Sequence, residues 1–145
     1  MSNLETIRSA VRRRENVTPE TLKEIDAALD SDPSAALWIL RGDAIQLSNG
    51  DSYDLADVEQ SYQRGIELAP SLPEPYESLG YFYFAVMDDA AKAKPYFEHA
   101  IALGGGESAA SGLQEAVAEI RDRAFQQSAA KINRQYAGLF QRLGK

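Results

Sequence analysis

Residues Pro73 to Gly105 read PEPYESLGYFYFAVMDDAAKAKPYFEHAIALGG and contain two apolar runs separated by a pair of aspartates. The first run has aromatic, leucine and glycine positions at helical spacing: Tyr76, Leu79, Gly80 and Tyr83. The second places an alanine and a phenylalanine four residues apart, Ala93 and Phe97. Because steps of three and four put side chains on one helix face, this stretch predicts two amphipathic helices joined by a tight turn.

The same arrangement occurs once more, and in part a third time, earlier in the chain. Residues 34–70 repeat it, with Trp38, Gly42 and Ile45 in the first helix and Tyr62 in the second. The turn between these helices is longer, and Asn49-Gly50 and Asp54 are suited to end one helix and begin the next. Residues 19–33 match only the second helix of the pattern, and Thr18-Pro19 is a typical helix start.

This spacing of aromatic, leucine, glycine and alanine positions resembles that of the tetratricopeptide repeat, a helix-turn-helix unit of about 34 residues. The resemblance implies an all-α fold of antiparallel helix hairpins, a right-handed α-solenoid, ending in a long C-terminal helix. Arg41 stands where the family has leucine, and Gly105 where it has proline. We expect one domain, 1–145, with these parts: a degenerate helical hairpin at 1–33, repeats at 34–70 and 71–105, and a C-terminal capping or extension helix at 106–145.

Two segments flank the repeats. At the N-terminus, residues 4–15 predict a short amphipathic helix with a run of arginines, best interpreted as a solvated helix end. At the C-terminus, residues 107–143 read as helix throughout, long enough to project beyond the repeats unless the helix kinks, with 126–128 as the favoured kink. Apolar residues from Leu113 to Leu143 are interpreted as one stripe along it.

Charge is distributed unevenly along the chain. The net charge is -7, but residues 20–98 hold 16 acidic and 5 basic side chains, whereas residues 123–145 hold five basic side chains and no acidic one. An acidic middle argues against nucleic-acid binding, which needs clustered Lys and Arg. It favours basic or amphipathic protein partners.

The residues needed for catalysis or metal binding are sparse. Cysteine is absent and His99 is the single histidine, so neither a thiol site nor a hydrolytic triad is expected. The acidic turn at 49–54 lacks the ligand spacing of a calcium loop, and no phosphate-binding motif is present. We therefore expect no enzyme activity, cofactor or metal. With no apolar run suited to a signal or a membrane span, a cytoplasmic location without membrane partners is expected.

The resemblance also implies a concave groove lined by the first helix of each hairpin. Carried onto this chain, one face of each first helix supplies these residues: Ala36, Ile39, Asp43 and Gln46, then Glu74, Glu77, Tyr81 and Phe84. Family members that bind chaperone C-terminal carboxylates use basic residues and asparagine there, so Ile39, Asp43 and Ser78 exclude that mode. An acidic and aromatic groove suits a basic or amphipathic peptide or helix of a partner.

Three functions stay open at this point. The first is a protein-interaction adaptor that uses this groove. The second is a self-assembling structural protein, a homodimer formed through residues 107–143. The third is a dedicated small chaperone or immunity partner. Tyr81 and Phe84 could equally lie under the C-terminal helix of their own chain, in which case the groove would be closed.

Overall fold

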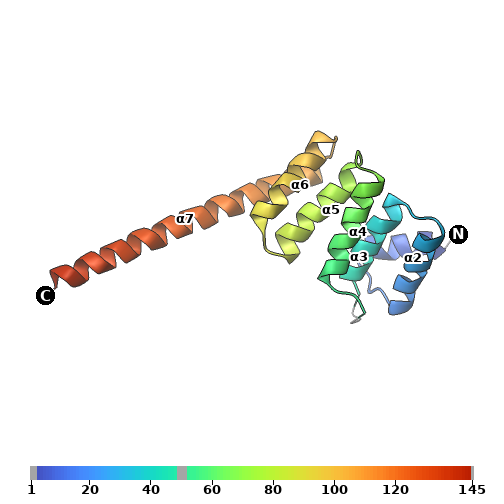
Figure 1. Cartoon of the computed structure of the whole chain (residues 1–145), viewed down its shortest axis with the longest axis horizontal. Coiled ribbons are helices and arrows are strands. Elements are labelled where there is room, and N and C mark those ends of the chain that lie inside the picture. The colour runs from blue at the N-terminus through green and yellow to red at the C-terminus, as the bar shows by residue number, and fades with distance from the viewer. Residues whose placement is uncertain (1–2, 49–51, 145) are drawn as a thin grey trace.

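The computed structural model describes residues 3–48 and 52–144, and they form an all-α fold (Figure 1). The elements in chain order are α1 (Asn3–Arg12), α2 (Pro19–Ser31), α3 (Ala35–Gln46), α4 (Leu55–Leu68), α5 (Pro73–Tyr81), η1 (Phe82–Val86), α6 (Ala90–Ala102) and α7 (Glu107–Leu143). Within the described ranges the only β pairing is an isolated bridge between Val17 and Ser48. The predicted all-α class is thus confirmed.

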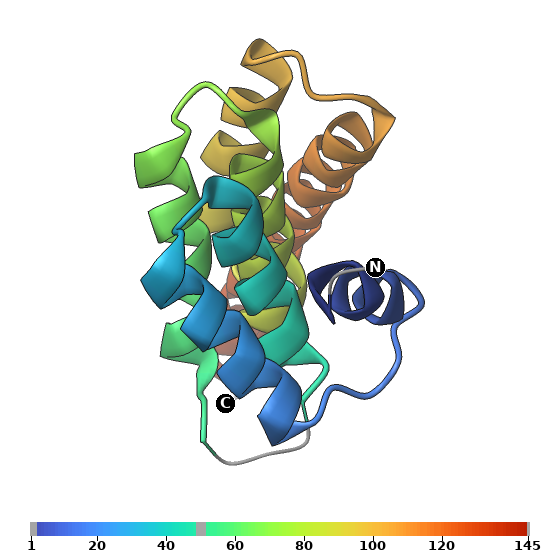
Figure 2. The ribbon, with the colours of Figure 1, turned by 90° about the vertical axis from the view of Figure 1, so that its right-hand side faces the viewer.

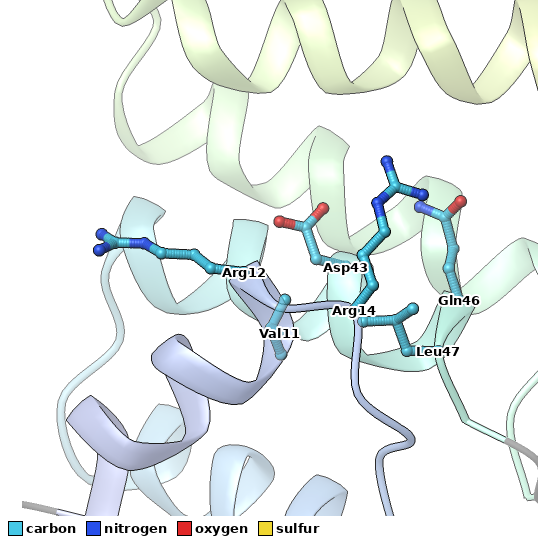
Figure 3. Close-up of a pocket in the computed structure, with 6 residues that line it drawn as sticks. All are labelled: Val11, Arg12, Arg14, Asp43, Gln46 and Leu47. Carbon is cyan, nitrogen blue, oxygen red and sulfur yellow. The ribbon is translucent and has the colours of Figure 1, made fainter.

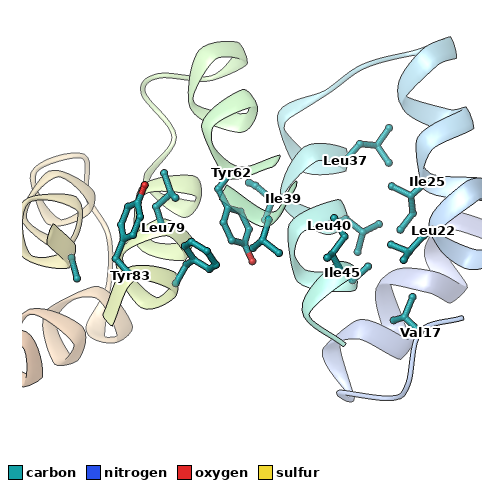
Figure 4. Packing of buried hydrophobic residues seen from close by; sticks show 14 of the residues in the cluster. Val17, Leu22, Ile25, Leu37, Ile39, Leu40, Ile45, Tyr62, Leu79 and Tyr83 are labelled. Atoms are coloured by element: carbon teal, nitrogen blue, oxygen red, sulfur yellow. The ribbon is translucent and has the colours of Figure 1, made fainter. Parts of the chain in front are cut away.

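Neighbouring helices pack against one another in chain order from α2 to α7. The most extensive contacts join α3 to α4, α5 to α6 and α6 to α7. Buried side chains form a continuous row from Leu22 on α2, through Ile39 and Tyr62, to Tyr83 on η1 (Figure 4). This arrangement is consistent with a helical repeat, because each hairpin exposes an apolar face that its neighbour covers.

Helix starts follow local side-chain capping. Thr18, Ser34 and Asp89 each accept a hydrogen bond from a backbone amide three residues ahead, at 3.2, 3.1 and 3.0 Å. At α4, Asp54 and Asp57 form a reciprocal capping box. The predicted N-caps Thr18 and Asp54 are confirmed, whereas the predicted Asn49-Gly50 C-cap lies outside the described residues.

Two aromatic rings are packed directly against glycines on facing helices. A Cβ added at Gly42 would lie 2.6 Å from the Tyr62 ring, and Cβ atoms at Gly80 and Gly112 would lie 2.7 and 2.4 Å from the Phe97 ring. Phe97 on α6 is thus clamped between α5 and α7. Close backbone approach, which only glycine allows, sets how tightly the three helices pack.

The first helix lies beside the stack, against α3 (Figure 2). It ends at Arg12, earlier than the predicted Glu15. Arg14 follows in the left-handed conformation, with φ of 56°, and the amide of Glu15 donates to the Ala10 carbonyl across the turn. These are the features of a Schellman C-cap, whose left-handed position is usually glycine.

The hairpin around the opening stretch contains a π-helical turn. After Tyr81 the helix widens into η1, and the amide of Met87 donates to the carbonyl of Phe82, five residues back, at 3.0 Å. A π turn contains more residues than an α turn, so side chains beyond it rotate away from the face that α spacing predicts.

The C-terminal helix runs without interruption from Glu107 to Leu143, as bounded in the sequence analysis, and the predicted kink at 126–128 is absent. Its buried residues all lie in the first part: Ala109, Gly112 and Ala116. The remainder projects from the body (Figure 1). In an unbroken helix the single predicted stripe is wrong, because residues near Leu113 and residues near Tyr136 lie on different faces.

Candidate functional site

A hollow of about 570 Å³ opens where α3, α5 and the start of α7 face the end of α1. We call it the central hollow. It is lined by Arg14, Asp43, Gln46, Tyr62, Glu77, Ser78, Tyr81, Phe82, Ala85, Val86 and Ser108. The lining therefore combines carboxylates, one guanidinium, two tyrosines and an apolar margin from η1.

Two smaller hollows continue from it along α1. One, of about 320 Å³, lies between Val11, Arg12 and Leu47; the other, of about 220 Å³, lies between Arg8, Ile39 and Glu74. Asp43 borders all three. Arg14 and Asp43 extend in a similar direction, whereas Arg12 extends from α1 in another direction and borders the two smaller hollows (Figure 3). Arg8 and Arg12 of α1, with Arg14 just after it, thus make the charge of the face mixed, not uniformly acidic.

A short hydrogen-bonded chain fixes Asp43. Gln46 donates from Nε2 to the Tyr62 hydroxyl at 2.7 Å, and that hydroxyl donates to Oδ1 of Asp43 at 2.5 Å. Burial raises the pKa of the Asp43 carboxyl above its ordinary value of 3.8, and the Tyr62 hydrogen bond lowers the pKa by less. Burial, then the Asp43 charge, also raises the pKa of Tyr62. The carboxylate is held rigidly while partly desolvated, which strengthens its attraction for a cation.

Tyr81 closes the other end of the central hollow. Its hydroxyl donates to the Ser108 carbonyl on α7 at 2.6 Å, and its ring packs edge-on against Phe97 with centroids 4.8 Å apart. The start of α7 therefore touches Tyr81 but leaves part of it exposed, so the groove stays open on one side.

The structure divides the predicted groove residues into three groups. Asp43, Gln46, Glu77 and Tyr81 meet in the central hollow. Ala36, Ile39 and Glu74 line the smallest hollow, opposite α1. Phe84 lines neither and packs instead against the buried core. The π turn at η1 accounts for this, because it brings Ala85 and Val86 to the face that α spacing assigned to Phe84.

Among the residues of the central hollow that the sequence analysis missed, Arg14 is the charged one. It stands in the left-handed position where glycine is favoured, yet its side chain lines the central hollow. A non-glycine residue in that conformation is strained, and such strain often accompanies a functional role. One feature of the sequence could have indicated this role: no glycine follows the arginine run, so an arginine has to occupy the left-handed position at the end of the helix.

A second polar cluster surrounds Arg41, away from the hollow. Its Nε donates to Asp26 at 2.8 Å and its Nη1 to Ser61 at 2.7 Å, while its guanidinium lies 5.6 Å from the Trp38 ring centroid and 5.3 Å from that of Tyr53. Tyr53 also donates to Asp26, at 2.5 Å. The departure from leucine at this position is therefore accommodated by a hydrogen-bonded network that joins α2, α3 and α4.

A metal-binding cluster is not assembled in the described part of the chain. Within residues 3–48 and 52–144, no three metal-ligating side chains cluster. His99 is exposed and stacks on Tyr76, with ring centroids 4.1 Å apart. What the central hollow offers is charge, hydrogen-bonding groups and an apolar edge, which together suit binding.

Asp43→Asn should stabilise the folded chain at neutral pH. The folded state raises the pKa of Asp43, so this group favours folding below pH 3.8, and the benefit is lost as pH rises through the folded pKa. Asparagine removes the desolvated charge and still accepts the Tyr62 hydrogen bond. Urea unfolding should give a higher midpoint than wild type at pH 7, and the difference should shrink near pH 3. A lower midpoint at pH 7 would contradict this reading.

No helix in the described ranges is long and apolar enough to cross a bilayer. Comparison with protein-family models finds no match to the chain, and comparison with curated proteins finds no relative.

Proposed function

We propose that this chain is a non-catalytic protein-interaction module, tetratricopeptide-like in its organisation, that binds a short segment of a partner protein in the central hollow. The observation that carries the proposal is the convergence of Asp43, Gln46, Glu77 and Tyr81, from two different hairpins, on one open hollow. Residues from separate repeats meeting on the concave side give repeat proteins their extended binding surfaces.

The lining indicates the chemistry of the segment. Asp43 and Glu77 offer carboxylates to a lysine or arginine, and the exposed Val86 of η1 offers an apolar contact beside them. Arg14 reaches into the same hollow and competes for those carboxylates. A basic, amphipathic segment therefore fits the hollow, and Arg14 would weaken its binding.

Displayed random peptides selected on the wild-type chain should be enriched in sequences that pair a basic with an apolar residue. Asp43→Asn with Glu77→Gln should weaken binding of a selected peptide about 10- to 100-fold, since a charged hydrogen-bonded contact contributes about 1.5–3 kcal/mol. Isothermal titration calorimetry of the purified chain with the synthetic peptide measures this change.

Two matched variants sharpen the test. Glu24→Gln with Glu98→Gln removes the same charge from exposed positions outside the hollow and should leave the affinity unchanged. Arg14→Gly removes the competing guanidinium and supplies the residue that the left-handed turn favours, so it should tighten binding without loss of stability. Equal affinities for the wild-type and Asp43/Glu77 variants would refute the proposal.

A further inference from the structure

The projecting part of α7 exposes more apolar surface than a solitary helix normally does. Side chains beyond Ile120 are almost all exposed, and Phe125, Phe140 and Leu143 are 74%, 69% and 71% exposed. A helix without tertiary contacts is only marginally stable in water. A contiguous exposed apolar patch of this kind indicates an interaction surface.

The apolar residues of this segment follow a heptad spacing. Steps of four and three residues alternate along one face, which we call the C-terminal stripe: Phe125, Ala129, Ile132, Tyr136, Leu139 and Leu143. This 3.5-residue period is that of a coiled-coil seam, where each side chain inserts between those of a facing helix.

The C-terminal stripe lies on the far side of α7 from the body. The face that packs on the body carries Ala109, Gly112 and Ala116. At 100° per residue, Ile132 is turned about 160° from Ala116. A helix docked on the stripe would therefore meet no part of the body of the same chain, and Figure 1 shows this segment extending clear of the other helices.

The positions of the charges decide which occupant fits. None of the five basic residues in 123–145 belongs to the stripe, and the same residues include no acidic side chain. Only one of the six positions directly beside the stripe is charged: Gln126, Ser128, Asn133, Gln135, Phe140 and Arg142. A helix lying in an anionic membrane surface needs cations beside its apolar face to reach the phosphates. Here only Arg142 lies beside that face, whereas Arg123, Lys131 and Arg134 lie at positions away from it.

We propose that the C-terminal stripe is a dimerisation seam that pairs with the same stripe of a second copy of this chain, in antiparallel orientation. The seam is separate from the central hollow and does not depend on its function. A dimer of this kind would hold two central hollows at opposite ends of a shared two-helix connection.

Packing and charge both favour the antiparallel orientation. Centred on Arg134, it places Leu139 against the small Ala129, Tyr136 against Ile132 and Leu143 against Phe125, whereas a parallel pair would set the two Ala129 residues together and leave a gap. Residues 1–122 carry 22 acidic and 10 basic side chains. Antiparallel pairing separates these two acidic bodies and brings each basic tail near the body of the other copy.

Size-exclusion chromatography with light scattering tests the seam on the full chain. Near 100 μM, wild type should show about twice the monomer mass of 15.9 kDa. Ile132→Lys with Leu139→Lys buries two charges in the seam and should raise the dimer dissociation constant at least about 100-fold. Gln127→Lys with Gln141→Lys adds the same charge on the opposite face and should leave the dimer intact.

Three outcomes would contradict the proposal that the C-terminal stripe is a dimerisation seam. The first is a wild-type chain that stays monomeric near 100 μM. The second is a dimer that the Ile132 and Leu139 changes leave intact. The third is sedimentation of the wild-type monomer with phosphatidylserine vesicles that the same changes abolish, which would assign the stripe to a membrane. Because the stripe lies outside the core, the variant should keep the wild-type urea midpoint when both are monomeric at high dilution.

Cysteine cross-linking tests the orientation, since the natural chain has no cysteine. Ala129→Cys with Leu139→Cys in one chain should oxidise to a covalent dimer, because the two positions face each other across an antiparallel seam. Within one helix they lie about 15 Å apart, too far for a disulfide. Ala129→Cys alone should not cross-link. Cross-linking by Ala129→Cys alone would show a parallel pair and overturn the proposed orientation.

Discussion

Replacing Phe97 by alanine is expected to lower the free energy of unfolding by about 3–5 kcal/mol, the largest effect of any single truncation considered for this chain. The ring is fully buried and fills the space where α5, α6 and α7 meet. Gly80 and Gly112 present bare backbone to it from either side, so neither neighbour has a side chain that could move into the space. Urea unfolding followed by circular dichroism measures the loss. Leu68→Ala, at an exposed position of α4 away from the C-terminal stripe, is the control and should change stability by less than about 0.5 kcal/mol.

The packing of Phe97 against Gly112 predicts that a smaller side chain at position 97 can compensate for a larger one at position 112. Gly112→Ala alone should destabilise by about 1–3 kcal/mol, because its Cβ would lie 2.4 Å from the Phe97 ring, although alanine favours the helix. In a Phe97→Leu background there is room for the methyl group, so the loss should fall sharply or reverse. Gly138→Ala, where no atom lies within 4 Å, should not destabilise. Additive effects of Gly112→Ala and Phe97→Leu would contradict the clamp.

Loss of the Phe97 ring should also change the shape of the central hollow. Tyr81 packs edge-on against that ring and donates to Ser108 at the start of α7. Without the ring, both the tyrosine and the docked end of α7 lose a support. The clamp therefore links the stability of the last hairpin to the shape of one end of the hollow.

Features set by neighbouring residues were predictable from the sequence. The caps at Thr18 and Asp54 and the bounds of α7 depend on contacts within one or two turns, which spacing and residue type reveal. Helical periodicity along the chain also agreed with the all-α class that the tetratricopeptide resemblance implied. Four predicted groove residues meet in one hollow because α3 and the regular part of α5 keep α spacing.

Features set by distant contacts or by backbone departures could not be read in this way. The π turn at η1, which moves Phe84 off the hollow, has no clear sequence signal. The position of α1 against α3 depends on tertiary packing, so Arg14 was interpreted as solvated. The single stripe predicted from Leu113 to Leu143 combined residues from two faces of α7. It included a step of eight residues, and eight residues rotate a helix by about 80° beyond two full turns.

The tetratricopeptide resemblance, the superhelix and the predicted partition of the chain stay predictions. The structure does explain how the chain accommodates its strongest departure from the repeat pattern, which is Arg41. Arg41 replaces an expected leucine, and a charged side chain in a core position normally has a large desolvation cost. Its hydrogen bonds to Asp26 and Ser61, with two flanking aromatic rings, offset that cost.

Arg41→Ala is therefore expected to destabilise by about 3 kcal/mol, because Arg41 is only 9% exposed and its truncation leaves a void and removes a paired guanidinium. Arg41→Leu should cost no more than about 1 kcal/mol, since Ser61 keeps its bond to the Asp57 carbonyl and Asp26 is exposed enough to hydrate. Asp26→Asn should destabilise wild type but have little effect beside Arg41→Leu, where no buried cation remains. Urea midpoints and the fluorescence of Trp38, the single tryptophan, report both changes. Equal losses for Arg41→Ala and Arg41→Leu would show that the guanidinium itself, and not the filled volume, stabilises this junction of α2, α3 and α4.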